Sequence, residues 1–242
     1  MPPEKLSPEI RALGFDVFGT VVDWRNSITR EGEAFGKKHN ITHVDWLKFA
    51  VAWRGLYQPM MNKVRHGEIG WTKLDDLHRM ALDQLLKDFD IKGVAEADVD
   101  HFNRAWHRLD PWPDAVPGLT RLKTKFVLTT LSNGNVALMV NMAKRAGLPW
   151  DVILGAEPTR HYKPQREAYI GTAEYLGLQP GELMLVAAHN GDLKAASGFG
   201  LRTAFVPRPT EHGPGQTKDL APDGAWDFVA KDFVSLAEQL GC

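Results

Sequence analysis

Four short polar segments of the sequence carry side chains able to do chemistry, and each stands near the carboxyl end of a predicted strand. They are Asp16-Val17-Phe18-Gly19-Thr20, Ser132-Asn133-Gly134, Lys163-Pro164 and His189-Asn190-Gly191-Asp192. Together they supply two carboxylates, an ammonium, two hydroxyls and an imidazole. A lysine ammonium within ~4–6 Å keeps a carboxylate ionised, and an ionised carboxylate can act as a nucleophile. We therefore expect a hydrolase whose nucleophile is Asp16.

The elements that position these segments alternate along the chain. The apolar runs predict strands over 13–18, 126–131, 151–154, 183–188 and 201–206. Helices are predicted over 135–146, 164–176 and 192–199, each followed by a glycine. This alternation predicts an α/β fold with a Rossmann-like parallel sheet, covered by helices on both faces. Because ligands bind at the carboxyl ends of such strands, the four segments should meet at one rim. Residues 207–222, rich in Pro, Gly and polar residues, are predicted to form a surface loop.

Residues 23–113 follow a different pattern. Apolar residues recur at helical spacing over 46–61 and again over 71–85, and no convincing strand is found there. We predict a helical cap, residues 23–113, inserted after the first strand into an α/β core formed by 1–22 and 114–242. Six of the eight tryptophans lie in the insertion. Most should form the cap's own core, and one or two should line a pocket between cap and core.

The composition excludes several classes of function. The 242 residues are 43% hydrophobic, enough for a sizeable core, and 29 basic against 30 acidic residues leave no basic excess for nucleic acid. The single cysteine, Cys242, excludes a disulfide framework and thiolate-rich metal sites. No secretory signal and no membrane-length apolar run is found. We expect a cytoplasmic protein that binds neither nucleic acid nor membrane.

The order of the motifs adds a resemblance to a known family. D-x-x-G-T on the first strand, S-N near mid-chain, then K-P and an acidic motif resemble the haloacid dehalogenase superfamily. The resemblance covers nearly the whole chain and includes the position of the cap. Each motif alone is weak, whereas all four in this order are specific.

Finer features resemble one branch, the type II L-2-haloacid dehalogenases. Superfamily phosphatases usually carry a second aspartate two residues after the nucleophile, where this chain has Phe18, and Ala188 replaces an acid of their metal-binding motif. Tyr169, six residues after Lys163, and the pair Trp53-Arg54 match the dehalogenases. Since Mg²⁺ prefers several oxygen ligands, the resemblance implies an enzyme that needs no metal and no cofactor. It also implies a homodimer.

The reaction implied by the resemblance is the hydrolysis of short 2-haloacids in two steps. Asp16 attacks the carbon that bears the halogen, and the halide leaves. Water then cleaves the aspartyl ester at its carbonyl carbon, so that an L-2-haloacid yields a D-2-hydroxy acid. Haloacetates, fluoroacetate included, belong to this substrate class.

Residues of the core have expected roles and plainer alternatives. Lys163 should hold Asp16 ionised, and Asp192 should orient the lysine or the hydrolytic water. The alternatives are a surface lysine and a helix N-cap. Thr20 should hydrogen-bond the nucleophile, or else its own backbone. Ser132 and Asn133, which precede a predicted helix, should bind the substrate carboxylate, or else only cap that helix together with Asn135.

The remaining expected site residues have weaker support. Arg54 should reach from the cap to the halide or the substrate carboxylate, with Arg65 as the fallback, and the alternative is an arginine on the cap surface. Phe18 and Tyr169 should line the substrate site, although plain core packing also explains Tyr169.

His189 departs from the pattern, because the dehalogenases have asparagine there and a serine where this chain has Ala187. An imidazole can act as the general base for ester hydrolysis, and the alternative is a histidine bonded to a neighbouring loop.

Two other functions stay open. One is a Mg²⁺-dependent phosphatase of the same superfamily, with Asp16 and Asp192 as metal ligands. The other is a non-catalytic relative that binds small carboxylates or acts as a scaffold.

Overall fold

Six parallel strands form the sheet that carries the predicted motifs. In the computed structural model, which describes residues 9–242, they lie in the order β5 (Val152–Gly155), β4 (Val127–Ser132), β1 (Ala12–Phe15), β6 (Leu183–Ala187), β7 (Arg202–Phe205) and β8 (Phe228–Val229). β1 lies between β4 and β6, and Phe15 is in register with Thr130 and Val186. Asp16 follows directly, at the centre of the carboxyl edge. The α/β prediction is therefore confirmed.

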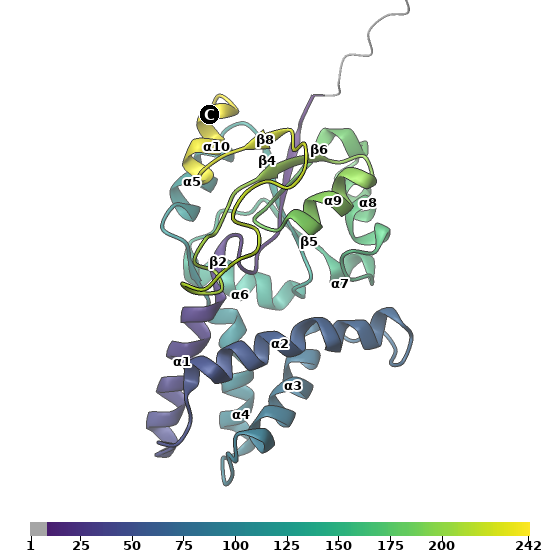
Figure 1. Cartoon of the computed structure of the whole chain (residues 1–242). Coiled ribbons are helices and arrows are strands. Elements are labelled where there is room, and N and C mark those ends of the chain that lie inside the picture. The colour runs from purple at the N-terminus through teal and green to yellow at the C-terminus, as the bar shows by residue number, and fades with distance from the viewer. Residues whose placement is uncertain (1–8) are drawn as a thin grey trace, which may run out of the picture.

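Helices cover both faces of the sheet, as Figure 1 shows. They are α5 (Ala115–Leu122), α6 (Val136–Ala146), α7 (Ala156–Thr159), α8 (Arg166–Tyr175), α9 (Asn190–Gly198) and α10 (Phe233–Gln239), with a short 3₁₀ turn, η2 (Pro180–Glu182). Along β6, Met184 and Val186 join one hydrophobic cluster, whereas Leu183 and Leu185 join the other. This alternation is what a strand buried on both faces requires.

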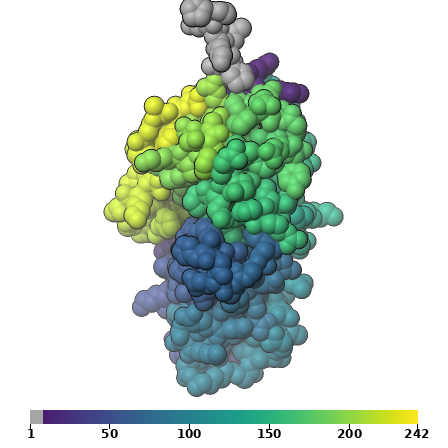
Figure 2. All heavy atoms as spheres, turned by 90° about the vertical axis from the view of Figure 1, so that its right-hand side faces the viewer, coloured from purple at the N-terminus to yellow at the C-terminus, as the bar shows by residue number. Residues whose placement is uncertain are grey.

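The helical insertion extends away from the carboxyl edge of the sheet (Figure 1). It contains α1 (Trp24–His39), α2 (Trp46–Arg65), α3 (Leu74–Asp88), α4 (Glu96–Asn103) and the 3₁₀ helix η1 (Arg104–Arg108). Aromatic rings fill its centre, with Trp53 edge-to-face against both Phe49 and Trp106. In the space-filling view the blue α2–α3 region lies against the green part of the core (Figure 2). The limits 23 and 113 of the cap stay a prediction.

Two glycines of α1 allow the cap helices to pack closely. A Cβ at Gly32 would lie 2.6 Å from the Trp46 ring, and a Cβ at Gly36 would lie 2.5 Å from it. Glycine lowers the helix propensity of this segment, which explains why the sequence did not predict α1. The close approach to Trp46 is what stabilises the helix.

Several predicted boundaries were wrong. The insertion does contain strand, because β2 (Val22–Asp23) pairs antiparallel with β3 (Asp110–Pro111) where the chain leaves and re-enters the core. Two residues are too few to give a readable pattern. Pro164 precedes its helix, since α8 begins at Arg166. The Lys163–Pro164 peptide bond is cis. Helix α9 begins at Asn190, two residues before the predicted start.

None of the helices within residues 9–242 combines the length and the apolar character that crossing a membrane would need.

Candidate active site

Asp16 is held by three groups at the carboxyl edge of β1. Its Oδ2 accepts a hydrogen bond of 2.7 Å from the Thr20 hydroxyl and lies 3.0 Å from Nδ1 of His189, while its Oδ1 lies 3.0 Å from Nζ of Lys163. The residue is 8% exposed. Burial raises the pKa of Asp16, but Lys163 and the two hydrogen bonds outweigh burial and hold the pKa far below its usual range. Asp16 is therefore an ionised, aimed carboxylate.

Lys163 connects the two carboxylates of the rim. It is 6% exposed, and its ammonium donates both to Asp16 and to Asp192. Burial lowers its pKa, but the two carboxylates more than compensate and leave the pKa raised. Asp192 also accepts a hydrogen bond of 2.6 Å from the Tyr169 hydroxyl. The structure thus excludes the surface-lysine alternative and brings Asp16, Lys163 and Asp192 together at the rim, with Tyr169 beside Asp192. Their roles in catalysis stay predictions.

His189 lies between two carboxylates, one of which the sequence did not reveal. Its Nδ1 faces Asp16, and its Nε2 lies 2.8 Å from Oε2 of Glu211. Burial lowers the pKa of His189, but Glu211 and Asp16 together raise it well above 6.5. Since a carboxylate only accepts, the imidazole donates from both nitrogens. In this state His189 is a cation held by two anions.

Glu211 belongs to the segment that was predicted to be a surface loop, and that prediction was wrong for this part of it. The residue is 1% exposed, and its Oε1 accepts a hydrogen bond of 2.9 Å from Nε1 of Trp24. A Cβ at Gly19 would collide with this carboxylate, and Gly19 has φ +88°. The glycine of the D-x-x-G-T motif therefore leaves room for Glu211. Its position after β7, at the same sheet edge, was the one available signal.

A buried ion pair holds the Glu211 segment against the core. Both terminal nitrogens of Arg208 donate to Asp114, at 2.6 and 2.9 Å, and its Nε donates 2.8 Å to the carbonyl of Thr20. The bidentate geometry gives this contact specificity as well as strength. It therefore ties the segment to the loop that carries the nucleophile.

The start of α6 is arranged differently from the prediction. Asn135 occupies the N-cap position, but its side chain bonds Asp75 of the cap, and Glu157 accepts from the N–H of Val136 at 2.6 Å. The Asp75 contacts draw the asparagine away from capping. Ser132 is buried and accepts from the N–H of Gly134, while the side-chain oxygen of Asn133 accepts from the N–H of Lys163. Both residues lie at the rim as predicted.

Arg54 is directed into the cap–core boundary, among aromatic rings. Its guanidinium carbon lies 4.1 Å from the ring centre of Tyr57, 5.5 Å from Trp24 and 6.0 Å from Phe18. Its Nη1 is buried without a hydrogen-bond partner among the described residues. The cap-surface alternative is therefore wrong. The structure gives no contact between Arg54 and Asp16.

Arg65, the fallback candidate, has a different place. Its guanidinium donates to the backbone carbonyl of Lys163 and, at 2.7 Å, to the side chain of Asn62. It joins the end of α2 to the K-P segment rather than pointing at the nucleophile.

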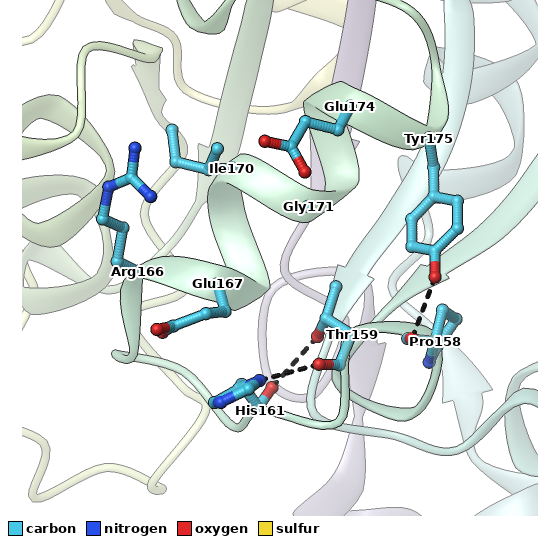
Figure 3. A pocket seen from close by; sticks show the side chains of 9 residues that line it. All are labelled: Pro158, Thr159, His161, Arg166, Glu167, Ile170, Gly171, Glu174 and Tyr175. Carbon is cyan, nitrogen blue, oxygen red and sulfur yellow. Dashed lines mark hydrogen bonds between the residues drawn. The ribbon is translucent and has the colours of Figure 1, made fainter.

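A separate hollow of about 480 Å³ lies on α7 and α8 (Figure 3). Thr159, His161, Glu167 and Tyr175 are among its lining residues, and His161 bonds the carbonyl of Thr159 at 2.7 Å. None of the residues that contact Asp16 lines it. The hollow is thus separate from the residues around Asp16.

The charges around His189 predict how stability depends on pH. A raised pKa contributes stability that is complete below the ordinary value of about 6.5 and is lost as pH rises through the folded-state value. The pKa values of Asp16 and Glu211 are lowered, so their contribution is lost only as pH falls into the acid range. We expect the free energy of unfolding to decline from near pH 7 upward, and His189→Asn to flatten that decline in denaturant titrations. His66→Asn, at an exposed histidine, should keep the wild-type slope. A His189→Asn profile parallel to wild type would contradict the assignment.

Comparisons with known proteins show the family of the chain. A model of the haloacid dehalogenase-like hydrolases matches residues 10–200. The structure of the defluorinating L-2-haloacid dehalogenase Rha0230 is 50% identical, with a TM-score of 0.94 over 96% of each chain. The L-2-haloacid dehalogenase PA0810 is 45% identical, with a TM-score of 0.92 over 96% of this chain and 99% of that one. (S)-2-haloacid dehalogenase 4A of Burkholderia cepacia is 26% identical over 94% of this chain and 98% of its own length. The chain therefore belongs to the haloacid dehalogenase-like hydrolases.

Proposed function

We propose that the chain hydrolyses short 2-haloacids, fluoroacetate among them, with Asp16 as the nucleophile. The observation that carries the proposal is a buried, ionised Asp16 beside Lys163 and Phe18. The ring of Phe18, two residues after the nucleophile, cannot give a proton to the alkoxide that a phosphate ester releases. The halide that a haloacid releases needs no proton. The names of the relatives Rha0230 and PA0810 support the same substrate class.

The first step is a displacement at carbon. One oxygen of Asp16 forms a bond to C2 of the haloacid, the carbon–halogen bond breaks, and the electron pair leaves with the halide. Lys163, together with Ser132 and Asn133 at the rim, binds the substrate carboxylate and aligns it for attack. No proton is transferred in this step.

The second step is hydrolysis of the aspartyl ester, and His189 has the geometry of its base. Forming the ester neutralises Asp16, which removes one of the two anions that hold the imidazole protonated. The pKa of His189 falls, Nδ1 releases its proton to solvent, and the free nitrogen accepts a proton from water. That water attacks the ester carbonyl and the bond to the leaving oxygen breaks. The leaving oxygen takes the second proton of the water, so that the 2-hydroxy acid leaves, the Asp16 carboxylate is restored and His189 is again protonated. Glu211 orients the ring through Nε2 throughout.

The two alternative functions are not favoured. A phosphatase would need Mg²⁺ held by Asp16 and Asp192, but the ammonium of Lys163 bonds both carboxylates, and the side chains of Phe18 and Ala188 supply no oxygen ligand. A non-catalytic relative would not need an ionised nucleophile bonded to Thr20, Lys163 and His189.

The direct test is halide release from a panel of haloacids with EDTA present. We expect one halide and one 2-hydroxy acid per substrate consumed, with inversion for L-2-chloropropionate, because attack from the back inverts the carbon. Lys163→Met should lose nearly all activity, since the buried carboxylates then lose their counter-ion. Lys194→Met, on α9, is the matched control.

Failure of every haloacid to release halide would contradict the proposal, and Mg²⁺-dependent turnover of phosphate esters would replace it. The homodimer and the cytoplasmic location stay predictions.

A further inference from the structure

Buried polar atoms without partners gather around the ring of Phe18. In residues 9–242 they include Nη1 of Arg54, both ring nitrogens of His78 and Nε1 of Trp106. The rings of Trp106 and His78 lie edge-to-face with Phe18, at 5.9 and 6.5 Å, and the Arg54 guanidinium is 6.0 Å from it. Such unpaired atoms are rare in folded proteins and need an explanation. Here three residues leave them unpaired at one place.

His78, on α3, is the least expected member of this group. It is 2% exposed and stacks on Trp106 with ring centres 4.4 Å apart. Burial lowers the pKa of His78 to about 3, so the ring is neutral and carries one N–H. The recess beside it, between α2 and α3, has no space for a water-sized sphere. This recess therefore holds neither water nor a halide, and a ligand of the ring has to lie on the side of Phe18, which does not line the recess.

The group adjoins the loop that carries the nucleophile, because its members contact Phe18. Phe18 is two residues from Asp16, and the Tyr57 ring contacts both Phe18, at 6.0 Å, and Arg54, at 4.1 Å. The charge of Arg54 also lowers the pKa of His78, so the two side chains are electrostatic neighbours. Unpaired N–H donors, a guanidinium and the positive edges of aromatic rings are the groups that attract a small anion.

We propose that the ring N–H of His78 binds the departing halide beside Arg54, the arginine that the sequence led us to expect there, and that His78 thereby determines which halides the enzyme releases. The inference rests on the proposed dehalogenation. As the C2–halogen bond breaks, the halide takes the electron pair and accepts a hydrogen bond from an N–H group of each of the two side chains. Donors unpaired in the free enzyme stabilise charge that exists only as the bond breaks. Fluoride, the smallest and most basic halide, depends on them most.

The test compares leaving groups in two variants of His78. His78→Phe keeps the stacking and removes both nitrogens, whereas His78→Asn keeps an N–H donor. For His78→Phe we expect kcat/KM to fall about 100-fold with fluoroacetate and less than about threefold with bromoacetate, the range of one removed donor at a developing anion. His78→Asn should recover part of the fluoroacetate activity. Leu82→Met, one turn along α3, should act like wild type on both.

Thermal unfolding separates this role from packing. His78→Phe removes unpaired buried nitrogens, so its unfolding midpoint should equal or exceed that of wild type. Wild type should gain more stability from sodium fluoride than the variant does, because a bound anion stabilises the folded state. An equal fall on fluoroacetate and bromoacetate with a lower midpoint would make His78 a packing residue and overturn the proposal. If wild type releases no bromide from bromoacetate, the proposed function is wrong. If sodium fluoride then also raises the unfolding midpoints of wild type and His78→Phe equally, the halide site is wrong as well.

Discussion

Replacing Asp16 with asparagine should lower kcat for every haloacid by a factor on the order of 10⁴ or more, the range found when a covalent nucleophile is removed. The amide keeps the size of the side chain and can still accept from Thr20, but it carries no charge and is a poor nucleophile. Lys163 and His189 then also lose an anion that they contact at 3.0 Å. The measurement is steady-state halide release. Asp23→Asn, a helix N-cap that tolerates either residue, is the matched control.

An isotope experiment identifies the bond that Asp16 forms. One turnover in ¹⁸O-labelled water with excess wild-type enzyme should place the label in the carboxylate of residue 16, because water attacks the carbonyl carbon of the ester. The labelled oxygen should reach the hydroxy acid only in later turnovers. Mass analysis of the peptide that bears residue 16 detects it. Label found in the product of the first turnover, with none in the peptide, would mean that water attacks the substrate directly.

The arrangement of the rim was predictable because parallel strands leave little freedom. Once the apolar runs are read as parallel strands, the residues that follow them must converge at one edge. Asp16, Lys163, Asp192 and His189 are therefore neighbours although up to 176 positions separate them.

Glu211 was not predictable in the same way. It belongs to an irregular segment with no periodicity, and its burial depends on the Arg208–Asp114 pair, which joins residues 94 positions apart. No local pattern of Pro, Gly and polar residues distinguishes such a segment from an exposed loop. The room above Gly19, which a Cβ would fill, also appears only when the fold is complete.

His78 and helix α1 show the same limit in the cap. Histidine at a helical core position reads as an ordinary member of an apolar face, and its lack of partners appears only when the neighbouring helices are in place. Packing against Trp46 likewise stabilises α1, whose glycines lower its intrinsic helix propensity. Local sequence thus specified the sheet better than the surfaces packed onto it.

Glu211→Gln should slow ester hydrolysis far more than ester formation. The expected fall in steady-state kcat is about 10²–10⁴-fold, the range for the orienting acid of a histidine base. Glutamine has one acceptor oxygen, whereas Glu211 accepts from both His189 and Trp24. The ring therefore loses its orienting charge, and one of the two donors loses its partner. Alkylation of Asp16 needs no proton transfer and should stay fast.

The consequence is a burst: rapid release of about one halide per active site, then slow turnover, with the ester on Asp16 visible in the mass of the intact protein. His189→Asn should give the same burst, and the double variant should be no slower than the worse single variant, because the two residues act as one unit. Glu31→Gln, at a partly buried glutamate that pairs with Arg108 in the cap, should show neither effect. If Glu211→Gln lowers the burst rate and the steady-state rate equally, the water is activated elsewhere, and Asp192 becomes the residue to test. A burst seen only in the His189 and Glu211 variants would mean that Glu211, which an irregular loop supplies, acts with His189 in the hydrolysis of the ester on Asp16 and not in its formation.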